Sequence, residues 1–162
     1  MKKYKWLIIV LNLMILLVYF NFSVVKKENL LKDGKLILLS LAPVDPRSLM
    51  QGDYMTLRYS ISENLNVNSL PKRGYCVVKL NPQGIAEKVR FQKNTTPLNK
   101  GEYLIEYNSP DQWNVNIGAE SFFFQEGQAE KYEKAKYGAI KVDTKGNSLL
   151  VGLYDENLKN IK

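Results

Sequence analysis

Four charged side chains in one short stretch are the first candidates for chemistry. The stretch PVDPRSLMQGDYMTLRYSI covers residues 43–61 and contains Asp45, Arg47, Asp53 and Arg58. Opposite charges near a turn either form a structural network, in which Asp caps backbone amides and pairs with Arg, or recognise a partner. The sequence leaves both interpretations open. The candidate binding surface predicted from this stretch consists of Asp45, Arg47, Gly52, Asp53, Tyr54 and Arg58.

A second candidate is a group of glutamates in EGQAEKYEKAKYG, a segment that predicts one short helix. Glu126, Glu130 and Glu133 are spaced i, i+4 and i+7, so a helix would place them on one side. Carboxylates that converge can transfer protons or hold a divalent cation. The alternative is ordinary surface pairing with Lys134 and Lys136. We add Glu126 and Glu133 to the candidate surface and predict no metal site.

A third possibility is nucleophilic catalysis, for which the residues are poorly suited. The chain has no histidine, which removes the commonest general base. Ser48 with Lys79 or Lys88 would make a Ser/Lys pair. The single cysteine, Cys76, stands in GYCVVKL, a strand pattern that would bury it as a small apolar residue. We predict no catalytic residue and no cofactor.

The elements that must position these residues begin with an apolar segment. Residues 6–25, WLIIVLNLMILLVYFNFSVV, contain no charge, and a helix of that length just spans a hydrocarbon core of about 30 Å. A cleaved signal peptide would need small residues at its cleavage site, where this run instead has the bulky YFNF of residues 19–22. We therefore predict an uncleaved, single-pass membrane anchor in the lipid bilayer.

The excess of positive charge surrounds this anchor. Residues 1–35 hold 7 Lys and Arg against 2 acids, whereas residues 36–162 hold 16 against 14. Lysines beside a membrane helix can meet anionic headgroups, and the remainder is too close to neutral to predict nucleic-acid binding. Because the reverse topology would move a tail with three lysines across the membrane, we expect the N-terminus in the cytoplasm and the domain outside.

The remaining sequence predicts mainly strands. Residues 1–25 form the tail and anchor, 26–35 a polar, turn-like linker, and 36–162 one β domain. Alternation in YMTLRYSI places Met55, Leu57, Tyr59 and Ile61 on one face. Hairpins are predicted at residues 75–91, turning at NPQG, and at residues 139–153, turning at TKGN; further strands are predicted in KLILLSLAPV, EYLIEY, WNVNI and SFFF. We predict a mainly β fold, an antiparallel barrel or sandwich with one short α-helix.

Aromatic residues offer one more binding hypothesis. Trp113 and the phenylalanines at 122–124 could line a groove for a small ligand or a peptide, although packing into the core is the commoner role for such rings.

The segment GDYMTLRY, residues 52–59, resembles the pattern that defines the GDYXXLXY family of bacterial proteins. Gly52, Asp53, Tyr54, Leu57 and Tyr59 fill every fixed position of that pattern. The flanking PVDPRSLMQ, and the later FQEGQAEKYEKAKYG and GNSLLVGL, are also similar to that family. The resemblance implies a membrane-associated protein without an assigned activity, often encoded beside multi-pass membrane proteins, and it supplies no catalytic residues.

The same stretch is similar in outline to membrane-anchored signal peptidases, in which a catalytic Ser precedes a Pro and a Gly-Asp pair. In this chain Val44 occupies the place of that serine, and the spacing to Gly-Asp is one residue longer. The sequence therefore predicts a non-enzymatic accessory or binding subunit that engages a multi-pass membrane partner through its DPRS…GDY surface. The alternative is a cryptic or degenerate hydrolase at the membrane surface, with Ser48 or the glutamates as its site.

Overall fold

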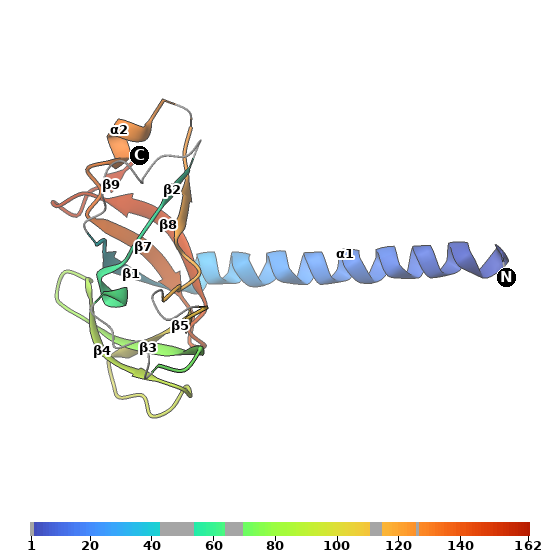
Figure 1. Ribbon diagram of the computed structural model, residues 1–162, viewed down its shortest axis with the longest axis horizontal. Coiled ribbons are helices and arrows are strands. Elements are labelled where there is room, and N and C mark those ends of the chain that lie inside the picture. The colour runs from blue at the N-terminus through green and yellow to red at the C-terminus, as the bar shows by residue number, and fades with distance from the viewer. Residues whose placement is uncertain (1, 43–53, 64–69, 111–114, 126) are drawn as a thin grey trace.

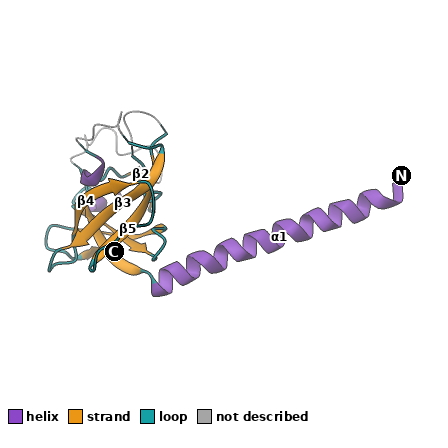
Figure 2. Ribbon diagram, turned by 90° about the horizontal axis from the view of Figure 1, so that it is seen from below, coloured by secondary structure: helices purple, strands orange, loops and turns teal. Residues whose placement is uncertain are grey.

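A computed structural model describes residues 2–42, 54–63, 70–110, 115–125 and 127–162. One long helix projects from a β domain as a nearly straight rod, and the N-terminus lies at the end far from the domain (Figures 1 and 2). Among these residues the domain combines three antiparallel sheets with one short α-helix and a 3-10 helix, η2 (Ser60–Ser62), which confirms the mainly β prediction.

The long helix, α1 (Lys2–Asp33), is apolar and exposed along most of its length. Residues Tyr4–Asp33 are long and apolar enough to cross a membrane, a property that an anchor shares with a signal sequence. The prediction of a turn-like segment at residues 26–35 is wrong for most of that span, because the helix continues to Asp33. Its sequence, KKENLLKD, contains good helix formers and no glycine or proline before Gly34.

The first sheet has the order β1-β7-β8-β9. Its strands are β1 (Lys35–Ser40), β7 (Tyr137–Val142), β8 (Ser148–Tyr154) and β9 (Asn160–Ile161). The predicted final hairpin is confirmed as β7 and β8, which turn through Asp143–Asn147. The pairing of β9 with β8 was not predicted, since two residues carry no periodic pattern.

The second sheet has the order β4-β3-β5, formed by β3 (Arg73–Leu80), β4 (Ala86–Gln92) and β5 (Glu102–Asn108). It confirms the predicted hairpin around NPQG, where Gly84 has a φ of 81°. The third sheet pairs β2 (Tyr54–Thr56) with β6 (Ser121–Phe123).

Single bridges connect the edges of these sheets into a ring. Leu41, just after β1, bridges to Tyr59; Asn108 of β5 bridges to Asn116; and Leu38 of β1 bridges to Ile85 beside β4. The ring therefore passes from β1 through residues 54–59 to β6, β5, β3 and β4, and back to β1. The core shared by the sheets contains Ile37, Leu39, Leu57, Tyr59, Cys76, Val78, Ile105, Tyr107 and Ile140.

Two predicted elements differ from the structure. WNVNI forms only an isolated bridge at Asn116 within its described part, and Gly118, with a φ of 78°, separates that bridge from β6. The predicted helix is confirmed but spans one turn, α2 (Ala129–Tyr132). The helix ends early because Lys136 pairs with the first sheet. The N–H of Lys136 donates to Tyr154 O at 2.8 Å, and the C=O of Lys136 accepts from Leu41 N at 2.9 Å. Tertiary pairing overrides the local helix propensity.

Candidate functional site

The described part of the GDYMTLRY motif, residues 54–59, which we call the motif segment, separates its side chains onto two sides. Met55, Leu57 and Tyr59 are buried, as the alternation predicted, whereas Tyr54, Thr56 and Arg58 face outward. Backbone hydrogen bonds hold the segment on both edges. Two of the motif's fixed positions are therefore core residues, and the outward side chains are the ones that a partner can reach.

Those edge contacts fix the position of Arg58. Its carbonyl accepts a hydrogen bond from the N–H of Ala42 at 2.8 Å, while the neighbouring N–H of Leu57 donates to Glu120 O at 2.6 Å. The backbone at this point is thus paired with β1's extension on one side and with the β6 segment on the other. The Arg58 side chain is displayed from a backbone that is anchored on both sides.

Tyr59 acts as a structural residue. Its hydroxyl donates to Ala119 O at 2.5 Å, and its ring lies against Gly138 of β7, where an added Cβ would come within 2.8 Å of the ring. Burial, and secondarily the negative charge of Glu120, raise the pKa of the Tyr59 hydroxyl. The phenol therefore stays protonated and serves as a hydrogen-bond donor.

Tyr54, in contrast, contributes to the surface. It is 38% exposed and packs against Phe123 of β6, which is 74% exposed, with ring centroids 5.7 Å apart. The alternation of SFFF places the neighbouring rings inside, where Phe122 and Phe124 both pack against Tyr132 of α2. An aromatic groove built from all three phenylalanines is therefore not present, and the hypothesised Trp113 lies outside the described residues.

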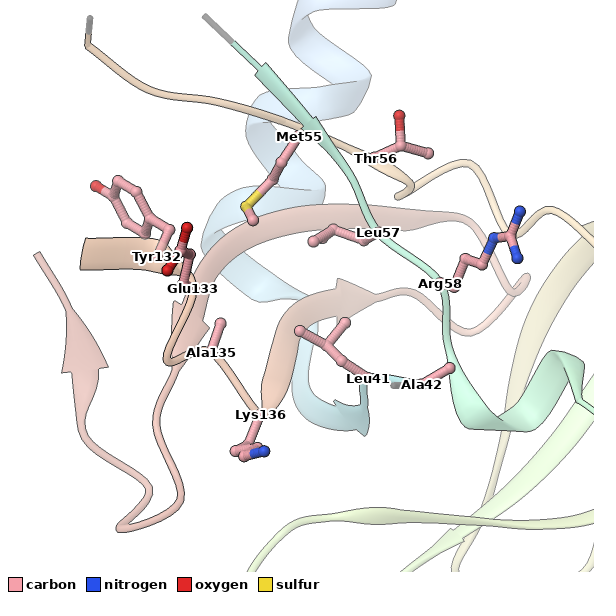
Figure 3. A pocket seen from close by; sticks show the side chains of 10 residues that line it. All are labelled: Leu41, Ala42, Met55, Thr56, Leu57, Arg58, Tyr132, Glu133, Ala135 and Lys136. Carbon is pink, nitrogen blue, oxygen red and sulfur yellow. The ribbon is translucent and has the colours of Figure 1, made fainter. Parts of the chain in front are cut away.

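A hollow of about 280 Å³ lies between the motif segment and the end of α2. Figure 3 shows Met55, Leu57, Leu41 and Ala135 pointing toward this space, while Arg58 and Lys136 point away from its centre. The side chains that point inward are thus apolar, while Thr56, Arg58, Glu133 and Lys136 add polar groups to the lining. This volume is near the lower end for small-molecule sites.

A second, more polar hollow of about 750 Å³ lies on the other side of the motif segment. Its lining includes Ser62, Glu63, Asn116, Glu120 and Ser121. Thr56 and Arg58 line both hollows. The motif segment therefore forms a ridge that carries Tyr54, Thr56 and Arg58, with an apolar hollow on one side and a polar hollow on the other. We call this the ridge surface.

The structure brings together only part of the predicted site. Arg58 and Glu133 line the same hollow, and Tyr54 adjoins it on β2. Asp45, Arg47, Gly52, Asp53 and Glu126 lie outside the described residues, as does Ser48.

The predicted face of three glutamates is wrong where it can be followed. Glu130 belongs to α2 and Glu133 is its C-cap, still in helical conformation, but Gly127, with a φ of 80°, precedes the helix, so the i to i+7 spacing does not lie on one continuous helix. The predicted pairing of Glu130 and Glu133 with lysines is also wrong, because the salt bridge found within the described residues joins Arg90 to Glu102.

Cys76 occupies the core, as predicted. It is fully buried, and burial raises the pKa of its thiol to about 12. Lys88, one of the lysines proposed for a Ser/Lys pair, donates to the carbonyl of Ile61 at 3.4 Å.

Sequence reasoning missed Thr56, Phe123, Leu41 and Lys136 as members of the ridge surface. The alternation of YMTLRY already placed Thr56 beside Tyr54 and Arg58, and the same rule applied to SFFF would have singled out Phe123. Nothing local indicated Leu41 and Lys136, which reach the hollow because β1 and β7 pair antiparallel, so that the end of β1 lies beside the beginning of β7.

Comparison with known proteins gives one match. The family model described as GDYXXLXY protein matches residues 16–153, which is most of the chain. No curated protein matches the chain. No solved structure matches it either.

Proposed function

The chain belongs to the GDYXXLXY family, whose model matches residues 16–153, and on that premise we propose that it is a non-enzymatic accessory subunit of a membrane complex. In this proposal α1 anchors the protein in the bilayer with its N-terminus in the cytoplasm. The β domain outside then binds a multi-pass membrane protein through the ridge surface and the adjoining DPRS…GDY residues.

The observation that carries the proposal is the position of Arg58. Its backbone is paired on both edges, and its side chain stands between two hollows of different polarity. A cation and an exposed aromatic pair, Tyr54 with Phe123, on a rigid backbone are the kind of residues that dominate protein interfaces. The apolar hollow beside them offers a socket for one side chain of the partner.

The chemistry of the ridge surface also favours binding over catalysis. Arg58 and Lys136 diverge from the apolar hollow instead of meeting in it (Figure 3). Proton transfer needs an acid and a base within hydrogen-bond reach of one reacting group. Charges spread along a rim instead provide complementarity and orientation to a partner.

A pull-down tests this role. Tagged full-length protein is solubilised in mild detergent beside two variants, Arg58→Ala and Tyr54→Ala, and bound membrane proteins are identified by mass spectrometry. Matched controls are Arg73→Ala on β3 and Val89→Ala on β4, two exposed positions outside the ridge surface. We expect one multi-pass protein with the wild type and both controls, and its loss with the two ridge variants.

Protection of Cys76 from thiol reagents shows that each variant is folded. Recovery of the same multi-pass protein with all four variants would contradict a role for the ridge surface. Recovery of no such protein with the wild type would contradict the accessory role itself and direct attention to the hydrolase alternative.

A further inference from the structure

A second recess lies where α1 joins the β domain, away from the ridge surface. It has a volume of about 460 Å³ and lies between the last turns of α1 and the β7–β8 turn. Figure 1 shows β7 and β8 slanting toward the side of the domain from which α1 leaves. Lys26 and Lys35 contribute to its wall from one side and Lys145 from the other.

The recess has a fixed shape because α1 is fastened to the sheet. Leu30 is buried, and the N–H of Gly34 closes the helix by donating to Leu30 O at 2.9 Å. Lys141 of β7 donates from Nζ to the carbonyls of Leu31 and Lys32, at 2.5 and 3.2 Å. A cation at the carbonyl end of a helix also stabilises its dipole. Burial of Leu30 and the hydrogen bonds of Lys141 therefore hold the end of α1 against the sheet.

The recess lies level with the end of the apolar run. Lys26 is the first residue after uncharged residues 6–25, and its Nζ donates to Asn147 Oδ1 at 3.3 Å. Helix side chains tilt toward the N-terminus. This ammonium therefore lies no farther from the apolar run than its own Cα. If residues 6–25 fill the hydrocarbon core, the β7–β8 turn is at the depth of the headgroups.

The charges of the recess suit an anion. Of its two acids, Asp143 is engaged by the turn: its carboxylate accepts hydrogen bonds from Lys145 N and from Asn147 N and Nδ2. Asp33 is exposed at the end of α1. Within the described residues, none of Lys26, Lys35 or Lys145 forms a salt bridge. Three lysines therefore outnumber two acids in the lining of a recess whose exposed wall is mainly apolar, a combination that suits the headgroup and upper carbons of an anionic lipid.

We propose that this recess binds the phosphate headgroup of an anionic phospholipid, which would hold the β7–β8 turn on the membrane surface. The proposal rests on the membrane placement of α1 in the proposed function. It does not depend on the ridge surface or on any protein partner. Each lysine near an anionic membrane surface raises the binding constant of the protein segment for that surface about fivefold.

Fluorescence quenching in lipid nanodiscs tests the site in the full-length protein. Thr144→Cys, in the turn, is labelled with a small fluorophore, and Asn157→Cys, in the turn at the other end of β8, is the matched control. Both positions are exposed, and the native Cys76 is buried and stays unlabelled. The quencher is a nitroxide on the acyl chain near the headgroup, carried by phosphatidylglycerol in one set of discs and by phosphatidylcholine in the other.

We expect strong quenching at position 144, at least twofold greater with labelled phosphatidylglycerol at equal mole fraction, and little quenching at position 157. Replacement of both Lys26 and Lys145 by Gln should bring the ratio of the two lipids close to one. Equal quenching by both lipids in the unmodified site, or none at position 144, would overturn the lipid site. If added inorganic phosphate abolished the preference for phosphatidylglycerol, the recess would be a site for a free anion, and this result would also overturn the lipid site.

Retention of the protein in the discs separates the two proposals. A protein that stays in the discs but shows no quenching at position 144 refutes the lipid site and leaves the anchor intact. A protein that is lost from the discs refutes the anchor, and with it both proposals.

Discussion

Two neighbouring substitutions in the motif segment should have opposite consequences. Leu57 is 3% exposed and belongs to the core, whereas Arg58 points outward. Leu57→Ala removes three buried carbons, a loss of about 2.4 kcal/mol at about 0.8 kcal/mol per carbon. A cavity normally adds to this loss. Because Leu57 already borders a hollow of about 280 Å³, the site can relax or admit water, and we expect a total near the lower end, about 2.5–3 kcal/mol.

Cys76 provides the assay, since it is the only cysteine and is fully buried. Full-length protein in detergent micelles is exposed to a urea series, and a brief maleimide pulse labels the molecules whose Cys76 has become accessible. With a typical slope of about 2 kcal/mol per molar urea, Leu57→Ala should lower the midpoint by about 1.2–1.5 M. Arg58→Ala should change stability by less than about 0.5 kcal/mol, as exposed substitutions usually do.

The reasoning depends on the two faces of the motif segment. A midpoint that falls with Arg58→Ala and is unchanged with Leu57→Ala would mean that the segment faces the other way. Equal losses in the two variants would mean that Arg58 belongs to a structural network, the first interpretation of the charged stretch. Either result would also remove the basis for the ridge surface.

Three further outcomes can be measured with the same Cys76 assay. Tyr59→Phe should cost about 1–2 kcal/mol, because the buried carbonyl of Ala119 loses its donor; an unchanged midpoint would contradict the hydrogen bond. Gly138→Ala should cost about 1–3 kcal/mol, because the added Cβ would meet the Tyr59 ring at 2.8 Å. Hydrogen bonds from Arg90, then from Asn99, lower the pKa of Glu102 from 4.5 to about 2, so Glu102 stabilises the fold above pH 4.5 and loses this effect as the pH falls toward 2. Glu102→Gln should therefore lower the midpoint at pH 7 more than at pH 3, and the opposite order would refute this assignment.

The parts of the fold that could be predicted are those in which neighbouring residues determine the structure. Alternation identified Met55, Leu57, Tyr59 and Ile61 as core residues, and all four are buried. Turn residues located both long hairpins, since Gly84 and Gly146 have positive φ values at the predicted turns. Length and composition identified the apolar helix.

The parts that could not be predicted depend on pairing between distant segments. The ring closes through single bridges such as Leu38 to Ile85, which leave no periodic signal in the sequence. α2 stops at Tyr132, although the following residues favour a helix, because Lys136 pairs with Tyr154 and Leu41. The same pairing brings Lys136 to the apolar hollow. The site was therefore only partly predictable, because it depends, like the order of the strands, on pairing between segments that are distant in the sequence.

The motif itself should be understood as a scaffold with a variable surface. Leu57 and Tyr59, two of its fixed positions, are buried, and Tyr59 is held by Ala119 and Gly138. Thr56 and Arg58 occupy positions that the pattern leaves open, and they are the exposed residues among the three, with buried Leu57, that line both hollows. Fixed residues at core positions preserve the backbone geometry, and the fixed Tyr54 supplies a constant aromatic ring on the ridge surface. The open positions 56 and 58 face outward and can change without a cost in packing. If the ridge surface binds a partner, the choice of partner therefore resides in Thr56 and Arg58, and exchanging these side chains should change binding while the fold stays the same.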